Sequence, residues 1–303
     1  MQEGLYGLTQ KGEMTLKIAA FGEIVWDVYP DNACLGGAPL NFAAHLARHG
    51  HEVYMLSAVG EDDYGEQALL QLQDLGVHTE YIARLKDKQT GKCLVSLNEA
   101  GVPMYDLLQD TAYDHIPTAS VGADVLYFGT LALRSEHNRH TLRQLLDSDR
   151  FADVFVDVNI RAPFYSEETI RFAVEQATIL KISDEELPTV AKALHTQATD
   201  QKRFMQTLMQ AYPRLQCLIL TRGAEGSYVL HRDDNAVCSC AGKAVEVVST
   251  VGAGDSFSAA FLHMYSKKEP VCCCADYAST VAGFVVSRQE AVPPYDPQDF
   301  VTM

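Results

Sequence analysis

Short apolar runs rich in β-branched residues alternate along the chain with longer segments whose apolar positions recur at helical spacing. The runs with strand character are 16–21, 53–59, 92–97, 124–128, 153–158, 178–182, 217–221 and 227–230. The segments with helical periodicity are 38–49, 63–75, 135–147, 166–177, 184–195, 200–211, 254–267 and 271–287. Strands that alternate with helices are typical of a parallel sheet covered on both faces, so the pattern predicts a doubly wound α/β fold.

Two stretches break this alternation. Residues 28–37 and 88–113 contain strand-like pieces without an intervening helix, and the second stretch reads as an antiparallel excursion that turns near 99–101. A small β flap beside the main sheet would account for both. No repeat or low-complexity linker divides the remainder, so we expect 16–303 to form one domain. Residues 1–15 lack the apolar core of a signal peptide and are expected to form a disordered leader or an added remnant.

Composition narrows the range of partners. Forty acidic and 24 basic residues give a formal charge of −16, which opposes binding to a nucleic-acid backbone and fits a soluble cytoplasmic protein. No run reaches the roughly 18 apolar residues of a membrane span. The eight cysteines contain no C-x-x-C pair and no disulfide-like framework, so reduced and mostly buried thiols are expected in preference to a metal site.

Polar residues follow several of the predicted strands. In an open parallel sheet, ligands bind beyond the carboxyl ends of the strands. The residues placed there are Asp27, Asn159, Arg161, Ser183, Glu186, Thr221, Arg222 and Gly223. Any one of them fits an ordinary surface loop, but their coincidence at one edge of one sheet indicates a ligand site.

The stretch STVGAGDSF (249–257) sets two glycines and an acid directly before an apolar helical stripe. It lacks the lysine of a Walker A loop and the third glycine of a dinucleotide turn, which excludes both of those sites. The backbone N–H groups of Gly252, Ala253 and Gly254 are expected to be free at a helix N-terminus, where the helix dipole favours an oxyanion. Such a turn can hold a phosphate group.

Asp255 admits two interpretations. An acid in the first turn of a helix complements the helix dipole, which is sufficient reason for its presence. A carboxylate beside an anion-binding turn is also what phosphoryl transfer to a hydroxyl requires, because it orients the alcohol and accepts its proton. The residues alone leave both interpretations open.

A second glycine segment, LGGAPLNFAAHLARHG (35–50), has the features of a helix start. Gly36 and Gly37 allow close backbone approach, and Pro39 suits the first helical turn. Asn41 falls in that turn and could hydrogen-bond a polyol. The histidines of this region share no metal-ligand spacing with nearby cysteines and are expected at the surface: His45, His49 and His51.

With both glycine segments in view, the sequence resembles the ribokinase-like (PfkB) family of carbohydrate kinases, and within it the bacterial fructokinases. GGAPLNFAAHLARHG is similar to the N-terminal signature of that family, and STVGAGDSFSAAF is similar to the C-terminal one. The segments GEIVWD, DVNIR, KISDEE and TRGAEGS resemble the intervening fructokinase-type motifs. The resemblance runs from about residue 16 onward and implies a three-layer α/β/α fold with a mostly parallel central sheet and a small β lid.

The resemblance also implies roles for individual residues. The catalytic set is Asp255 as base, with Gly252, Ala253 and Gly254 as the anion hole. The sugar-binding set is Asp27, Gly36, Gly37, Asn41, Tyr105 and Arg161. The ATP-binding set is Ser183, Glu186, Thr221, Gly223 and Gly226, with Glu186 also organising the waters of Mg²⁺. Tyr105 could stack on a sugar ring or pack into the core of the lid, and packing is favoured.

Two departures from the family pattern fall where many members bind a monovalent cation. Ser249 stands in place of the acid that usually opens the C-terminal motif, and Glu290 lies in place of a glycine in a later turn. The loss of a carboxylate weakens a site for a hard cation, so K⁺ activation becomes doubtful.

The implied activity is transfer of the ATP γ-phosphate to a primary hydroxyl of a small sugar, with D-fructose as the first choice and fructose 6-phosphate as the product. A 2-keto-3-deoxygluconate kinase is the nearest alternative, because Arg161 could pair with a sugar-acid carboxylate. An inactive sugar-binding or regulatory protein is the alternative of another class, suggested by Ser249 and Glu290. The expected partners are a sugar and ATP, without nucleic acid or membrane, and a homodimer is left open.

Overall fold

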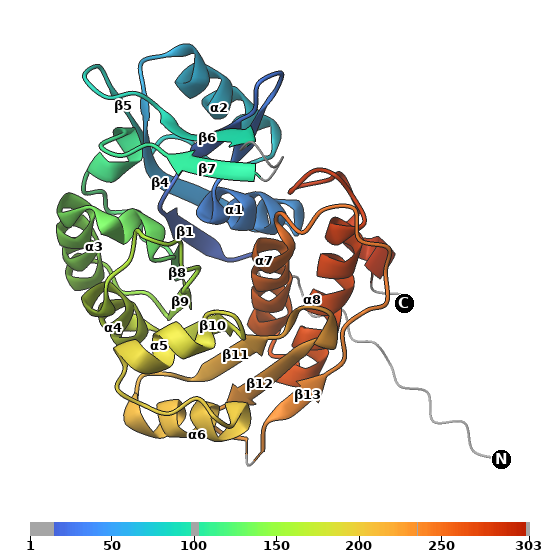
Figure 1. Cartoon of the computed structure of the whole chain (residues 1–303). Coiled ribbons are helices and arrows are strands. Elements are labelled where there is room, and N and C mark those ends of the chain that lie inside the picture. The colour runs from blue at the N-terminus through green and yellow to red at the C-terminus, as the bar shows by residue number, and fades with distance from the viewer. Residues whose placement is uncertain (1–14, 98–102, 235, 301–303) are drawn as a thin grey trace.

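The computed structural model describes residues 15–97, 103–234 and 236–300, and within them a nine-stranded sheet forms the centre of the molecule (Figure 1). The strands follow the order β13-β12-β11-β10-β9-β8-β1-β4-β5. Their bounds are β1 (Lys17–Phe21), β4 (Glu52–Gly60), β5 (Ile82–Leu85), β8 (Val125–Phe128), β9 (Asp153–Asp157), β10 (Ile179–Ser183), β11 (Cys217–Thr221), β12 (Ser227–His231) and β13 (Cys238–Cys240). All neighbours from β5 to β11 are parallel, and only β12 and β13 add antiparallel pairs. The predicted α/β fold is confirmed.

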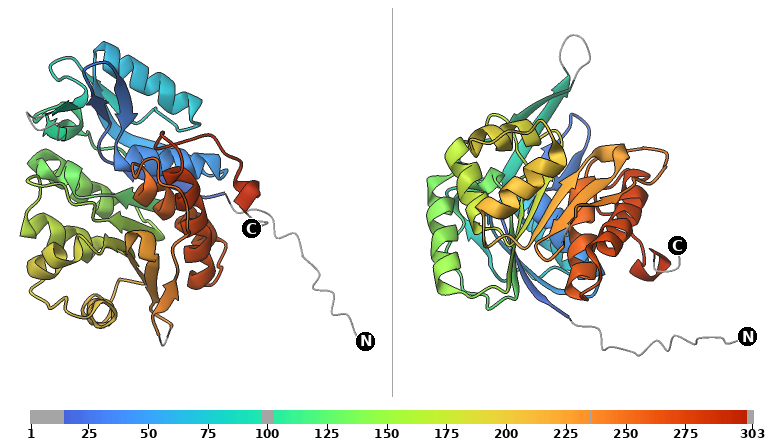
Figure 2. Two further views of the ribbon diagram at one scale, coloured as in Figure 1. Left: turned by 45° about the vertical axis from the view of Figure 1, so that its right-hand side comes forward. Right: turned by 90° about the horizontal axis from the view of Figure 1, so that it is seen from below.

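Helices cover both faces of this sheet (Figure 2). One face carries α1 (Ala38–Arg48), α2 (Asp63–Asp74), α7 (Ala253–Ser266) and α8 (Val271–Val286). The other carries α3 (Glu136–Ser148), α4 (Glu167–Gln176), α5 (Leu187–Ala193) and α6 (Gln201–Ala211). Because side chains alternate along a strand, Ile18 of β1 belongs to the first buried cluster and Phe21 to the second. The strands are therefore apolar on both sides.

A second, four-stranded sheet is built from the stretches that break the alternation of strands and helices. Its order is β3 (Ala33–Gly36), β2 (Val25–Val28), β6 (Gly91–Leu97) and β7 (Pro103–Leu107), as the upper part of Figure 1 shows. The pair of β6 and β7 is antiparallel, as predicted. The turn predicted near 99–101 and all but the last residue of the predicted leader lie outside the described residues.

Several short elements were not predicted. The strands β5 and β13 have four and three residues, too few to show a period of two. Four 3₁₀ helices join the main elements within the described residues: η1 (Ala112–His115), η2 (Leu131–Arg134), η3 (Gly223–Glu225) and η4 (Pro297–Phe300). In the part of the chain that the structure describes, no helix has the length and apolar character needed to cross a membrane.

The expectation that the thiols are reduced is wrong for one pair. Cys238 in β13 and Cys272 in the first turn of α8 form a disulfide, with their Cα atoms 5.9 Å apart. These residues are 34 positions apart in the sequence, so no spacing motif marks them. The other cysteines are free, and three of them, Cys93, Cys217 and Cys274, are buried as expected.

The histidines expected at the surface are instead buried between α1, α7 and α8. His45, His49 and His51 are at most 9% exposed. The Nδ1–H group of His49 donates to the carbonyl oxygen of His45 (2.7 Å), and its Nε2 accepts from the hydroxyl of Tyr277 (3.1 Å). Nε2–H of His51 donates to Nδ1 of His263 (2.9 Å). Burial keeps these rings neutral and lowers the pKa of His49 and of His51 to about 4, of His45 to about 3 and of His263 to about 2.

We expect the protein to lose stability as the pH falls from 6.5 towards 4. The pKa of His49 is lower in the folded chain (about 4) than its ordinary value of 6.5, so the unfolded chain takes up the proton first. The contribution of His49 is complete above pH 6.5 and falls by about 3 kcal/mol through this window, at about 1.4 kcal/mol for each pH unit between the two pKa values. Urea unfolding at a series of pH values measures the effect.

His49→Gln should flatten this pH dependence, because glutamine can hydrogen-bond but does not titrate. His140→Gln, at an exposed position of α3, is the matched control and should leave the slope unchanged. An unaltered slope in His49→Gln would show that another group titrates.

Candidate active site

The glycine turn lies where α7 begins. Gly252 has a φ of 80°, a conformation that favours glycine, and a side chain there would meet the carbonyl oxygen of Ala291 at 2.5 Å. The N–H group of Ala253 donates to the carbonyl oxygen of Thr250 (3.3 Å), so the expectation that it is free is wrong. The N–H groups of Gly252 and Gly254 have no acceptor among the described residues. The turn therefore retains donors for an anion, but fewer than predicted.

Asp255 lies half-buried in the first turn of α7, beside these amides. Asn41, from the first turn of α1, donates through Nδ2 to Oδ2 of Asp255 (2.7 Å), so the two glycine segments meet at this carboxylate. Burial raises the pKa of Asp255 to about 6. The hydrogen bond from Asn41 lowers it, the charge of Asp157 raises it, and the charges of Lys181 and Arg161 lower it.

Glu23, which follows β1, is a second buried carboxylate that the sequence analysis did not single out. It is 3% exposed, and its Oε2 atom has no hydrogen-bond partner among the described residues. Burial raises its pKa to about 7, against backbone hydrogen bonds and the charge of Arg161, and the charge of Asp255 raises it further. Gly37 packs directly on it, since a side chain at Gly37 would meet the carbonyl oxygen of Glu23 at 2.4 Å. An acid within the apolar run that joins β1 to β2 was the signal for it.

Lys181 and Asp157 form a buried ion pair below the glycine turn. They are opposite each other in the parallel register of β9 and β10, and Nζ of Lys181 lies 2.7 Å from Oδ2 of Asp157. The hydroxyl of Ser258 in α7 donates to the same oxygen (3.1 Å). Burial opposes the charge of Lys181, but Asp157 outweighs it and the pKa of the lysine is raised. Because Nζ lies 3.2 Å from where a side chain on Gly254 would begin, a positive charge sits directly under the turn.

Glu186 fixes the loop that carries Arg161. Its Oε1 accepts from the N–H group of Ile160 (2.6 Å), and its Oε2 accepts from the N–H group of Ser183 (2.8 Å). The hydroxyl of Ser183 in turn accepts from the N–H group of Glu186 (3.2 Å). Arg161 is exposed, and its charge lowers the pKa values of Asp255, Glu23 and Asp27. The predicted residues of strand ends β9 and β10 are thus brought together.

The residues predicted to bind sugar approach this centre from the second sheet. Asp27 in β2 is half-buried, and burial raises its pKa against the charge of Arg161. Gly36 would place a side chain 3.7 Å from Oδ2 of Asp27. The strand register puts Tyr105 on the same face as Asp27, by way of Cys93 and its neighbours in β6. Tyr105 is 67% exposed, so the expectation that it packs into the core of the lid is wrong.

The predicted nucleotide residues form a tight turn between β11 and β12. Thr221 ends β11, and Gly223 and Gly226 have φ values of 51° and 93°. The N–H group of Arg222 donates to the carbonyl oxygen of Gly226 (2.8 Å) and closes the turn. A side chain at Gly226 would meet the carbonyl oxygen of Cys240 at 2.1 Å, so this position requires glycine.

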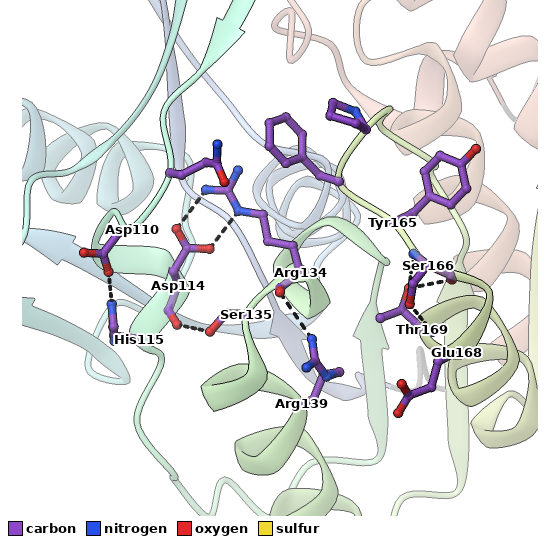
Figure 3. A pocket seen from close by; sticks show the side chains of 13 residues that line it. Asp110, Asp114, His115, Arg134, Ser135, Arg139, Tyr165, Ser166, Glu168 and Thr169 are labelled. Carbon is purple, nitrogen blue, oxygen red and sulfur yellow. Dashed lines mark hydrogen bonds and ion pairs between the residues drawn. The ribbon is translucent and has the colours of Figure 1, made fainter.

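A cavity of about 550 Å³ opens between the end of β7 and the segment before α4, starting two residues beyond Arg161 (Figure 3). Arg134 and Asp114 pair within it through two hydrogen bonds of 2.8 Å. The guanidinium group of Arg134 also lies 5.0 Å from the ring centre of Phe164. Asp255 does not line this cavity, so the largest hollow lies beside the carboxylate centre and not on it.

Comparison with known proteins gives a consistent result. The profile of the pfkB family of carbohydrate kinases matches residues 21–298. The fructokinase of Escherichia coli is 30% identical over 269 residues, which cover 82% of this chain and 84% of that protein. The fructokinase of Xylella fastidiosa with bound ATP superposes with a TM-score of 0.80 at 22% identity, covering 94% of this chain and 98% of that one. The fructokinase of Vibrio cholerae O395 in its fructose, ADP and calcium ion bound form gives a TM-score of 0.79 at 21% identity, covering 95% and 98%.

The fold and these similarities define a sugar phosphotransferase of the ribokinase-like α/β class. The chain belongs to the pfkB family of carbohydrate kinases, as its two glycine segments indicate.

Asn41→Ala is expected to raise the pKa of Asp255 above its value of about 6, because the hydrogen bond that stabilises the carboxylate is lost. Nuclear magnetic resonance of protein labelled at aspartate Cγ measures the titration, and the signal that disappears in Asp255→Asn identifies Asp255. Asn32→Ala, at an exposed position between β2 and β3, is the matched control and should leave the titration unchanged. An equal or lower pKa in Asn41→Ala would contradict the geometry.

Proposed function

We propose that this protein transfers the γ-phosphate of ATP to the primary hydroxyl of D-fructose that yields fructose 6-phosphate. The observation that carries the proposal is the Asp255 carboxylate, held by Asn41 at 2.7 Å beside the free amides of the α7 turn. The relatives support the choice of sugar, since the Escherichia coli protein is a fructokinase and the Vibrio cholerae structure contains fructose and ADP.

In this proposal, Asp255 acts as the general base. With a pKa of about 6 it is ionised at neutral pH, and it accepts the proton of the sugar hydroxyl as that oxygen attacks the γ-phosphorus. The N–H groups of Gly252 and Gly254, at the positive end of α7, stabilise the charge that spreads over the transferred phosphoryl group. The Ala253 N–H group, already bonded to Thr250, contributes less than its neighbours.

The second sheet is proposed to act as a lid over the sugar. Asp27, Gly36, Gly37 and Asn41 would hold sugar hydroxyls, with Arg161 near the acceptor. The exposed ring of Tyr105 is available to stack on the sugar, because it shares a face with Asp27. Closure of such a lid would exclude the water that could otherwise accept the phosphoryl group.

The nucleotide is proposed to bind along Ser183, Glu186, Thr221, Gly223 and Gly226. Both oxygens of Glu186 already accept a backbone N–H group, which suits contact with a metal ion through its waters. Mg²⁺ bound there would neutralise charge on the ATP phosphates. K⁺ activation stays doubtful in the proposal.

Beyond the reaction itself, we propose that residues 16–303 act as one kinase domain in the cytoplasm. A homodimer is one possible arrangement of that domain.

A 2-keto-3-deoxygluconate kinase is the alternative that one observation favours. Arg161 is exposed and lies close enough to Glu23, Asp27 and Asp255 to lower their pKa values, so its guanidinium group could pair with a substrate carboxylate. A sugar-binding protein without turnover is the alternative of another class.

Asp255→Asn should reduce kcat by about 10² to 10⁴ with little change in the KM for sugar, because asparagine keeps the shape but cannot accept the proton. Coupled measurement of ADP release with fructose and Mg-ATP tests this. Asp147→Asn, at an exposed position of α3, is the matched control and should keep full activity. Full turnover in Asp255→Asn would exclude Asp255 as the base.

A substrate panel of fructose, 2-keto-3-deoxygluconate, ribose and adenosine decides between the acceptors. We expect the highest kcat/KM with fructose, and we expect Arg161→Gln to lower it less than tenfold. A preference for 2-keto-3-deoxygluconate that Arg161→Gln abolishes would establish the alternative. Lack of turnover with every compound, together with binding of fructose, would favour the sugar-binding protein.

A further inference from the structure

Three cysteine sulfurs converge at the β13 edge of the large sheet. The Sγ atoms of Cys238, Cys240 and Cys272 all lie within 4.8 Å of one another. The disulfide joins Cys238 to Cys272, and Sγ of Cys240 lies 3.5 Å from Sγ of Cys238. Across the described ranges of the chain, no other group of three histidine, cysteine or acidic side chains is close enough to share a metal ion.

The fold holds these sulfurs together from two directions. Cys238 and Cys240 are two positions apart on β13, so their side chains leave the strand on the same face. Helix α8 lies against β12 and β13, and Cys272 is in its first turn (Figure 1). The helix N-terminus favours a thiolate there. Burial raises the pKa of the Cys240 thiol, and the ammonium group of Lys243 opposes that rise.

A disulfide alone does not account for this arrangement. Two sulfurs suffice for a disulfide, yet the third sulfur, that of Cys240, also faces the pair. In a tetrahedral zinc site with Zn–S distances of about 2.3 Å, neighbouring sulfurs are roughly 3.8 Å apart. The separation of 3.5 Å between Cys238 and Cys240 is close to that spacing.

We propose that the reduced protein binds one thiophilic divalent cation of the zinc type through Cys238, Cys240 and Cys272. A dithiol reductant supplies two electrons and two protons to the disulfide, which becomes two thiols, and the reductant leaves as its own cyclic disulfide. The cation then displaces the three thiol protons to solvent. Thiolates select this class of ion over Mg²⁺, so the site is distinct from any that serves the ATP phosphates.

The position of the cluster connects it to the turn between β11 and β12. The carbonyl oxygen of Cys240 lies against Gly226, where a side chain would approach it within 2.1 Å. A cation that ties β13 to α8 would therefore also hold the backbone that supports this turn. The cation site itself rests only on the three sulfurs and is independent of the sugar that the enzyme phosphorylates.

Titration of the full chain with Co²⁺ tests the proposal, because cobalt bound by thiolates shows sulfur-to-metal charge-transfer absorption. The protein is reduced with dithiothreitol, freed of the reagent without oxygen, and titrated. We expect one equivalent of Co²⁺ to bind the reduced chain, Zn²⁺ to displace it, and the disulfide form to bind at least 100-fold more weakly. Absence of the absorption in the reduced chain, or equal binding by both forms, would overturn the proposal.

Two variants locate the site. Cys240→Ser and Cys272→Ser should each weaken Co²⁺ binding by at least 100-fold, and Cys272 is exposed, so its replacement disturbs packing least. Cys34→Ser removes an exposed thiol from the second sheet and is the matched control, expected to bind within twofold of the parent chain. Binding that survives in both Cys240→Ser and Cys272→Ser would place the cation elsewhere and refute the assignment.

Discussion

The hydrogen bond from Asn41 to Asp255 joins the first turns of α1 and α7, and the candidate active site is arranged around that contact. The same helices meet again further along, where His51 and His263 form a hydrogen bond of 2.9 Å. Contacts at both ends fix the rotation and the height of one helix against the other. The two glycine turns, more than 200 positions apart in the sequence, therefore open onto one point. Neutral, buried imidazoles are the condition for this pairing, because charged rings would repel each other between the helices.

Charge balance explains why a cluster of carboxylates is tolerated at this point. Asp157 is paired with Lys181 and receives a hydrogen bond from Ser258, so its charge is compensated within the protein. Asp255 has a weaker arrangement, with one amide donor and the more distant charges of Lys181 and Arg161. Partial compensation leaves Asp255 basic enough to accept a proton and exposed enough to be reached. Full compensation, as at Asp157, produces a structural ion pair instead.

The sequence predicted what depends on local periodicity and turn chemistry, and it missed what depends on contacts between distant segments. The alternation of apolar runs defined the parallel strands, and the glycines marked Asn41 and Asp255. Lys181 gave no signal, because its partner lies on another strand and only the sheet register brings them together. His45 was expected at the surface because it lies on the polar face of α1, and periodicity does not show that other elements cover that face as well. The disulfide was missed because β13 has three residues and α8 begins far from it in the sequence.

The two raised pKa values at this site follow from one environment and lead to different charge states. Asp255, with a donor from Asn41, has a pKa of about 6, and Glu23, whose Oε2 lacks a partner among the described residues, has a pKa of about 7. Near neutral pH the aspartate is therefore ionised, while the glutamate carries its proton about half of the time. Each charge raises the pKa of the other, so a proton on Glu23 removes one source of repulsion from ionised Asp255. The proton is kept on Glu23 because burial costs the unpartnered carboxylate more than the hydrogen-bonded one.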